Sequence, residues 1–298
     1  MTTSLLLIKR NIKIFFKDKG MFFTSLITPI VLLVLYTTFL KRIYDESFTE
    51  NLPEYLEIDK SLIEGLVGGQ LISSLISVSC VTVAFNSNFL MVQDKVNGTI
   101  KDIGISPVKS STVSLSYYMA SIVSTSIVCI VALIICLIYL AIVGWYLSFA
   151  DVILLFINMI ILILFGTALS SIINIFLSTQ GQITAVATIV SAGYGFISGA
   201  YMPISSFNEV LQKIILFLPG TYGTALVRNY SMRGALKELG NQGIPGNVIE
   251  KIKDSIDCNL YFYGDKVSIG SMYMVMIVSV VLLISIYVLL NKLKKNNK

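Results

Sequence analysis

Long stretches without a charged side chain constrain the fold of this chain more than any other feature. Asp, Glu, Lys and Arg are all missing from residues 65–93, 110–150, 152–208 and 267–291. A helix needs about 20 apolar residues to cross the roughly 30 Å of hydrocarbon in a bilayer. Only 13% of the 298 residues are charged, whereas soluble domains carry about 25%. The sequence therefore predicts an all-α integral membrane protein and excludes a soluble globular one.

The apolar stretches divide into six expected transmembrane helices within a single domain that covers residues 1–298. Their boundaries follow from charged residues, from the polar break at residues 178–181, and from interfacial aromatic residues such as Trp145 and Tyr146. The uncharged stretch 110–150 is too short for two spans and a turn, so we expect one long helix there. The expected spans are residues 21–40, 65–92, 112–143, 152–177, 183–199 and 272–290.

The distribution of basic residues predicts the orientation of the spans. If the N-terminus is cytoplasmic, the inner segments are 1–20, 93–110, 178–182 and 291–298, and they hold 12 of the 22 Lys and Arg residues but 3 of the 17 acids. Short cytoplasmic segments are enriched in Lys and Arg. We therefore expect both termini inside the cell. The abundance of Ile, Lys and Asn suggests an AT-rich bacterial genome, so we expect the membrane to be a bacterial plasma membrane. The net charge of +5 then reflects topology, and we expect no nucleic-acid partner.

The first 20 residues form a pattern typical of a basic amphipathic helix on the inner membrane surface. On a helix, apolar side chains fall on one side and basic side chains on the adjacent side. The apolar set is Leu5, Ile8, Ile12, Phe15 and Phe16, and the basic set is Lys9, Arg10, Lys13 and Lys17. An ordinary basic flank of a span is the alternative, but a flank does not require the apolar stripe.

The segment between the second and third spans predicts a short helix at the cytoplasmic tip of a hairpin. Asn97-Gly98 signals a turn, Thr99 and Asp102 have the spacing of a capping box, and Pro107 ends the helix. A plain solvated loop is the alternative, but it requires neither the cap nor the isoleucines. Three apolar side chains on so short a cytoplasmic helix favour docking to a soluble partner: Ile100, Ile103 and Ile105.

This hairpin resembles the coupling region of type-2 ABC exporter permeases, the membrane subunits of drug, lipid and polysaccharide exporters. The matching residues are Asp94-Lys95, Gly98-Thr99 and Ser106-Pro107-Val108, although Val96 stands where the family usually has a second acid. The resemblance covers nearly the whole chain. Its other motifs are Phe15-Phe16-Lys17-Asp18-Lys19, Thr28-Pro29, residues 197–204, Leu218-Pro219-Gly220-Thr221-Tyr222 and Ala225-Leu226-Val227-Arg228.

The resemblance implies an N-terminal connecting helix, a cytoplasmic coupling helix and re-entrant external helices between spans five and six, within residues 200–268. It also implies two permease chains and two copies of an ABC ATPase, with the permeases meeting mainly through spans one and five. The residues that we assign to ATPase coupling are Asp94, Gly98, Thr99, Ile100, Asp102, Ile103 and Pro107, and those of the connecting helix are Lys9, Lys13, Phe15 and Phe16.

Two further patterns support the external region and the contact between chains. Ser206 and Glu209 have capping-box spacing before an apolar stretch, and Asn247 with Glu250 starts another amphipathic helix. Gly195 and Gly199 form a GxxxG pair that lets helices approach closely, so we expect a second permease chain to pack there. A homodimer is the expectation, and a heterodimer with a different permease remains open. The first external loop, 41–64, holds seven acids and three bases, which is typical of a solvated acidic surface.

Catalytic chemistry has little support in the sequence. The chain has no histidine, its four cysteines lack metal-site or redox spacing, and no GxxxxGK[ST] motif is present. We therefore expect no cofactor in this chain and no enzyme activity, with ATP and Mg²⁺ bound by a separate ATPase. The main alternative is an ATPase-independent secondary transporter or channel, which usually needs an ionisable residue inside the bilayer. A lipid transferase is a weaker alternative.

The uncharged spans favour an amphipathic or lipid-like cargo that leaves a bacterial cell. A drug, an antibiotic, a toxin and a glycolipid all remain open, and the sequence does not choose among them. It also does not show which residues contact the cargo.

Overall fold

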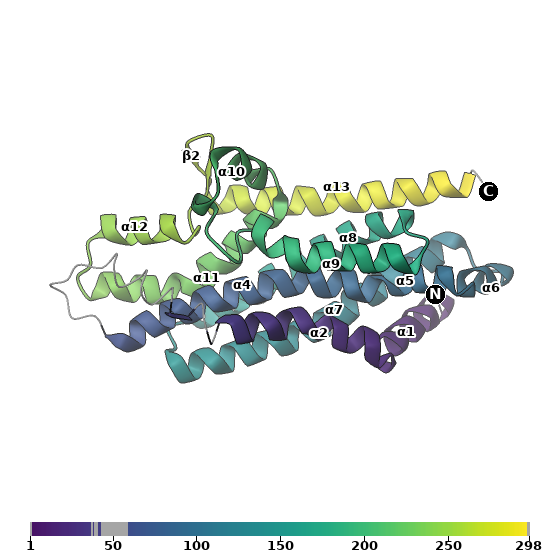
Figure 1. Cartoon of the computed structure of the whole chain (residues 1–298), viewed down its shortest axis with the longest axis horizontal. Helices are drawn as coiled ribbons and strands as arrows, with labels where there is room; N and C mark the ends of the chain where they lie inside the picture. Colours follow the sequence, from purple (N-terminus) through teal and green to yellow (C-terminus); the bar gives the residue numbers. More distant parts are fainter. Residues whose placement is uncertain (1, 37, 39–40, 43–58, 297–298) are drawn as a thin grey trace.

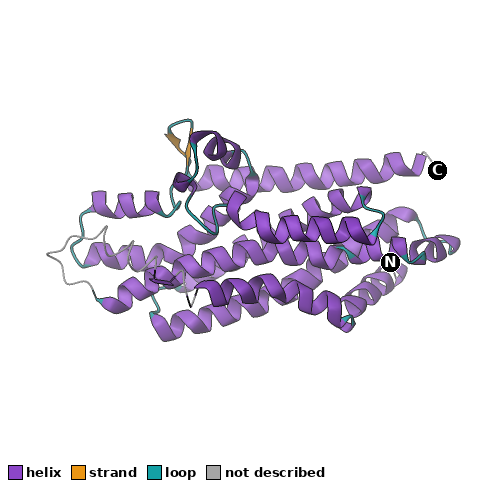
Figure 2. Cartoon of the chain, viewed as in Figure 1, coloured by secondary structure: helices purple, strands orange, loops and turns teal. Residues whose placement is uncertain are grey.

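The computed structural model describes residues 2–36, 38, 41–42 and 59–296, and its helices lie side by side along one long axis (Figures 1 and 2). The first external loop, for which an acidic surface is expected, lies mostly outside these residues. In chain order the elements are α1 (Thr2–Lys17), α2 (Lys19–Leu35), α4 (Lys60–Asn88), α5 (Leu90–Val96), α6 (Thr99–Ile105), α7 (Ser110–Val143), α8 (Phe149–Phe176), α9 (Gln180–Ile197), η2 (Ile204–Ser206), α10 (Glu209–Leu216), α11 (Pro219–Asn241), α12 (Gly246–Ser255), β1 (Tyr261–Phe262), β2 (Asp265–Lys266) and α13 (Ile269–Asn296).

Helix α4 is the central element of the bundle and packs against α2, α7, α8 and α11. Every residue from Gly65 to Asn88 is buried, which fits a helix that is apolar or small on all sides. Its hydroxyl and amide groups bond to neighbouring helices. Ser87 Oγ lies 2.6 Å from Ser121 Oγ, and Asn88 Nδ2 donates to Ser171 Oγ at 2.7 Å. These bonds fix the position of α4 against α7 and α8.

The membrane character of the chain is visible in its helices. Among the residues that the structure describes, four helices are long and apolar enough to cross a membrane: Lys60–Val96, Ser110–Val143, Phe149–Phe176 and Ile269–Leu293. The number rises to six if each of two bent helix pairs is one span. Many apolar side chains of α7, α8 and α13 face outward, as lipid-facing residues do. The chain is therefore a multi-pass helical membrane protein.

The bent pairs differ from the expected spans. Helices α1 and α2 meet at 71°, with Asp18 between them accepting a hydrogen bond from the Met21 backbone. Helices α10 and α11 meet at 84°. Helix α9, the expected fifth span, is not one of the four candidate spans, so the count of six stays a prediction. This helix begins at Gln180 and ends at Ile197, rather than at 183 and 199.

The region after α9 adds one long, largely buried helix to the bundle, and its external position stays a prediction. Helix α11 has 23 residues, most of them buried, and it packs against α4, α8 and α13. The capping box predicted at Ser206 and Glu209 is wrong, because Asn208 is the N-cap of α10 and accepts from the Leu211 backbone. Ser206 instead belongs to η2. Helix α12 starts where Asn247 and Glu250 predicted a helix, after Pro245.

Candidate functional site

Helix α6 forms the tip of the hairpin between α5 and α7, at the end of the bundle where α1 starts and α13 ends (Figure 1). Its seven residues, Thr99–Ile105, agree with the predicted short helix. The predicted capping box of Thr99 and Asp102 is wrong. Gly98 is the N-cap, with φ of 80° and no side-chain cap bond, and such a left-handed residue suits glycine. Thr99 is already the first helical residue, so its hydroxyl does not cap the helix.

The three isoleucines of α6 have different environments. Ile100 is half-buried and packs with Phe16, Phe22 and Val113 around a cluster that contains Phe15. Ile103 is half-buried, and Ile105 is 86% exposed. Ile105 and the outer side of Ile103 are therefore the apolar surface available to a partner, while Ile100 packs α6 against the bundle. Asp102 and Pro107 are exposed beside this surface.

Two neighbouring residues fasten the base of the hairpin to three other helices. Asp94 is buried and accepts hydrogen bonds from Arg10 Nη1 at 2.6 Å and from Tyr117 OH at 2.5 Å. Lys95 Nζ donates to the backbone oxygens of Asn174, Ile175 and Leu177 at 3.1, 3.1 and 2.7 Å. An ammonium group at a helix C-terminus satisfies carbonyls that have no helical partner. Asp94 thus joins the hairpin to α1 and α7, and Lys95 joins it to α8.

The contacts of α1 differ in part from those that its sequence predicts. Phe15 is buried and its ring lies 5.1 Å from that of Phe16, on the apolar side as expected. Lys9 and Lys13 are exposed, and Arg10 is the basic residue of α1 that reaches the hairpin. The sequence held one indication of this role: Arg10 is the single arginine among the lysines of α1, and arginine is favoured in buried ion pairs. Asn11 adds a bond to Ser116 Oγ at 3.4 Å.

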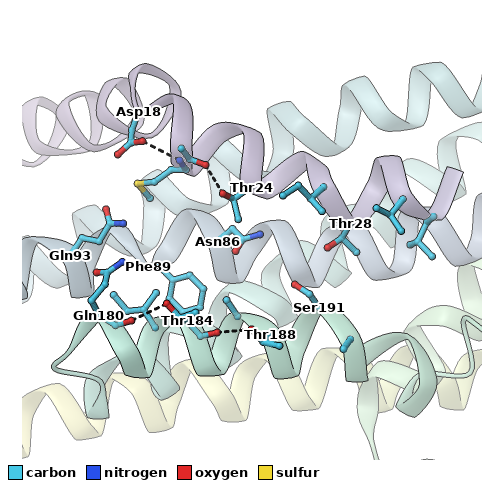
Figure 3. A pocket seen from close by; sticks show the side chains of 18 of the residues that line it. Asp18, Thr24, Thr28, Asn86, Phe89, Gln93, Gln180, Thr184, Thr188 and Ser191 are labelled. Carbon is cyan, nitrogen blue, oxygen red and sulfur yellow. Dashed lines mark hydrogen bonds between the residues drawn. The ribbon is translucent and has the colours of Figure 1, made fainter. Parts of the chain in front are cut away.

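A groove of about 1160 Å³ lies between α2 and α9, with the end of α4 and α5 forming its back wall (Figure 3). Most of its lining is apolar. Asp18 is its one charged lining residue in the described part of the chain. Its labelled polar residues come from both walls and from the back: Thr24, Thr28, Asn86, Gln93, Gln180, Thr184, Thr188 and Ser191.

Several hydroxyl groups of the groove already donate their hydrogen to their own helix. Thr24 Oγ1 donates to Gly20 O, and Thr188 Oγ1 donates to Thr184 O at 2.9 Å. Their oxygens keep the capacity to accept a hydrogen bond, and the amides of Asn86 and Gln93 offer donors and acceptors. An apolar groove with a few uncharged polar groups is suited to a neutral amphipathic molecule.

Gly195 and Gly199 were predicted to form one helical face that packs against a second chain, but their surroundings lie within the same chain. A side chain at Gly195 would collide with the ring of Tyr201 in the same chain. Gly199 lies beyond the end of α9 with φ of 67°, and Ile204 and Asp257 are its neighbours. The two glycines therefore do not form a continuous helical face, and each has an intrachain reason to be small. That a second chain packs on this part of α9 stays a prediction.

Comparison with known proteins gives one family. A family model described as ABC-2 type transporter matches residues 3–231. No curated protein and no solved structure matches the chain. The matched range includes α1, the α6 hairpin and both walls of the groove.

Proposed function

The chain belongs to the ABC-2 type transporter family, as its sequence resemblance predicts, and from this premise we propose that it is the permease subunit of an ATP-driven exporter. Family membership implies association with an ABC ATPase. In our proposal two ATPase subunits bind and hydrolyse ATP with Mg²⁺, and a second copy of this chain completes the transport path in a bacterial plasma membrane. The cargo is a neutral amphipathic or lipid-like compound that is carried out of the cell. Both termini of the permease lie on the cytoplasmic side.

The observation that carries this proposal is the pair of contacts at the base of the α6 hairpin. Asp94 bonds to Arg10 at 2.6 Å, and Lys95 bonds to the last carbonyls of α8. A force applied to α6 therefore reaches α1, α7 and α8 through charge-assisted bonds, which are stronger than neutral ones. A hairpin fastened in this way supports a role as the coupling element that the ATPase moves.

The path from α6 to the groove runs through α1. Arg10 ties α1 to the hairpin, and α1 continues through the bend at Asp18 into α2. Helix α2 is one wall of the groove, and Asp18 and Gly20 line its inner end. We propose that movement of α6 rotates α1 and shifts α2 against α9. The width of the groove then depends on the state of the ATPase.

The exposed apolar surface of α6 is the proposed docking surface for the ATPase. Ile105 protrudes at the tip, with Lys101 and Asp102 exposed on the preceding turn. A small apolar contact surrounded by charges is typical of protein interfaces with a polar rim. Gly98 and Thr99 act here by starting the helix, and Pro107 acts by ending the segment after it.

The groove supports the cargo side of the proposal. Its uncharged polar groups lie on both walls and at the back, and its volume of about 1160 Å³ is large enough for a drug-sized molecule. Helices α2 and α9 are the spans through which the sequence resemblance implies that two permeases meet. A second chain on this face would close the groove laterally and complete a two-sided path.

One experiment separates this proposal from a secondary transporter or channel. The chain is reconstituted in proteoliposomes, alone and with a candidate ABC ATPase. ATP hydrolysis is measured with and without candidate amphipathic compounds, and transport of these compounds is followed in the same vesicles. We expect hydrolysis that depends on both subunits and is stimulated by the cargo. Asp94→Asn should abolish the stimulation while the complex remains assembled. Transport by the chain alone, driven by an ion gradient and indifferent to the ATPase, would favour the alternative.

A further inference from the structure

A short segment after α9 crosses the end of the groove farthest from α6. Residues 199–204, which we call the strap, connect α9 to η2. Helices α2 and α9 both begin at the end of the bundle that carries α6 (Figure 1), so Leu35, Phe196 and the strap residues Tyr201 and Met202 line the opposite end of the groove. Tyr201 folds back onto α9, where its ring packs at Gly195 and lies 5.1 Å from the ring of Phe196.

The backbone of the strap is held by side chains from two helices. Ser74 Oγ of α4 donates to Ala200 O at 2.6 Å, and Tyr36 OH donates to Ser74 Oγ at 2.7 Å. Arg228 Nη2 of α11 donates to Gly199 O at 2.6 Å. Two successive carbonyls of the strap are therefore satisfied by side chains from other helices, as buried backbone groups must be.

An ion pair connects the two ends of the strap. Arg228 is 1% exposed, and its Nη1 lies 3.6 Å from Asp257 Oδ2. The same carboxylate oxygen accepts from the backbone N–H of Ile204 at 2.8 Å. Arg228 therefore holds the first residue of the strap, Asp257 holds the last, and each charge stabilises the position of the other.

Stability alone does not account for this pair. Apolar residues of similar volume often serve a buried position at least as well as an ion pair, because burying two charges is costly. Asp257 also has φ of 55°, which is unusual for a residue other than glycine. Such backbone strain persists where the surroundings determine a conformation, often at functional sites. The arrangement defines where the strap lies.

We propose that Arg228 and Asp257 are positioning residues that hold the strap in place, so that Tyr201 and Met202 close the outer end of the groove until the ion pair separates. This role goes beyond the proposed function and rests on it, since the groove is taken as the cargo path. Release of the strap would open the groove on the side where cargo leaves.

The test measures how easily a reagent reaches the groove from outside. Ser191, which lines the groove on α9, is replaced by cysteine in full-length protein whose four native cysteines, all buried, are changed to alanine. Intact cells are treated with a membrane-impermeant maleimide and the labelling rate is measured. Asn241→Cys, at the exposed end of α11, reports in parallel whether this region faces outward.

Three variants are compared in this background. Asp257→Asn removes one charge of the pair, and Arg228→Lys keeps the charge but loses the planar guanidinium that spans Gly199 O and Asp257. Glu250→Gln is the matched control, because Glu250 forms ion pairs with Lys253 and Lys266 at 2.8 Å in the same outer region. Glu250 is outside the set of side chains that hold the strap.

We expect Asp257→Asn to raise the labelling rate at position 191 by about tenfold or more, because a neutral amide does not attract Arg228 and binds the backbone N–H of Ile204 less strongly than a carboxylate does. Arg228→Lys keeps the charge opposite Asp257 and should raise the rate less than Asp257→Asn does, and Glu250→Gln should leave the rate unchanged. A correctly inserted Asp257→Asn protein that labels at the wild-type rate would overturn the proposal. If this variant fails to reach the membrane, Tyr36→Phe decides in the same assay, since it loosens the strap without unpairing a charge. An unchanged labelling rate in Tyr36→Phe would then contradict the proposal.

The assay needs neither cargo nor ATPase, so its outcome is separable from the proposed function. Faster labelling in Asp257→Asn, with no ATP-dependent transport in the wild type, would support the role of the strap and contradict the proposed exporter function. Normal transport with an unchanged labelling rate would support the exporter function and contradict the role of the strap.

Discussion

Arg10 Nη1 lies 2.6 Å from Asp94 Oδ2, although the two residues are 84 positions apart in the chain. This contact joins the N-terminal amphipathic helix to the base of the α6 hairpin, and Tyr117 OH donates to the same carboxylate oxygen. Asp94 is therefore the point at which α1, the hairpin and α7 meet. The first prediction tests whether this point transmits force.

Asp94→Asn should uncouple ATP hydrolysis from transport. The amide keeps the size of the side chain but removes the charge that Arg10 contacts, at a cost of about 1–3 kcal/mol for a hydrogen bond to a charged group. We expect a lower melting temperature in detergent, normal ATPase association and a loss of cargo-stimulated hydrolysis. Lys17→Gln, which changes an exposed cation on the same helix, serves as the control and should behave like the wild type.

The exposed tip of α6 should control ATPase binding. Ile105→Asp and Ile103→Asp each place a charge in a contact from which water is excluded, which is costly when the charge has no partner. Both variants should insert normally and lose the ATPase in a pull-down. Ile100→Asp should instead lower the stability of the permease itself, because Ile100 packs against the cluster of Phe15. Full ATPase association by Ile105→Asp and Ile103→Asp would exclude α6 as the docking surface.

Lys95→Met should loosen the junction between the hairpin and α8. The substitution keeps the long apolar stem and removes the ammonium that donates to Asn174, Ile175 and Leu177. We expect a loss of about 1–3 kcal/mol in the free energy of unfolding, since three carbonyls at a helix end lose a charged donor. Chemical denaturation in detergent measures this loss, and Lys95→Arg should recover most of it. Equal stability of Lys95→Met and the wild type would contradict the prediction.

Gly195→Ala should destabilise the chain from within. Its new methyl group meets the ring of Tyr201, and overpacking of this kind costs about 1–3 kcal/mol. Removing the ring as well, in Gly195→Ala with Tyr201→Ala, should cost less than the sum of the two single substitutions. Additive effects in this double-mutant cycle, together with a weakened dimer in Gly195→Ala alone, would instead place the glycine at a contact between chains.

Stability should depend on pH through Asp257. Burial raises the pKa of this carboxyl from 3.8 to about 6, and Arg228 and the Ile204 backbone offset only part of that effect. Between these two pH values the carboxyl group of Asp257 is protonated in the folded protein and ionised in the unfolded chain. This stabilisation is complete below pH 3.8 and is lost as the pH rises through about 6.

The melting temperature of Asp257→Asn, measured at pH values across this window, checks that sign. Arg228 of α11 is the charged side chain in contact with Asp257, the strap contributes backbone groups, and Cys258 follows it in the chain. The wild type should lose melting temperature relative to the variant between about pH 4 and pH 6. A constant difference between the two proteins would show that Asp257 does not titrate there.

Local patterns explain what could be predicted about the functional site. The short helix at 99–105 follows from a turn at Asn97-Gly98 and a stop near Pro107, and both signals act within a few residues. The predicted N-caps, Thr99 and Ser206, were wrong, because neighbouring residues are equally acceptable caps. The structure places Gly98 and Asn208 at these positions. Which of them caps the helix depends on the backbone path into it, and that path is set by packing.

Membrane class, family and the position of the α6 helix follow from the amino-acid sequence, because apolar length, charge spacing and turn residues are local properties of the chain. Tertiary structure alone decided that Ile100 packs inward while Ile105 protrudes, that Arg10 rather than Lys9 or Lys13 meets Asp94, and that Arg228 pairs with Asp257. Each of these facts concerns a contact between residues far apart in the chain. Hydrophobic periodicity indicates which face of a helix is apolar, but the partner of a buried polar side chain is fixed only when the helices pack.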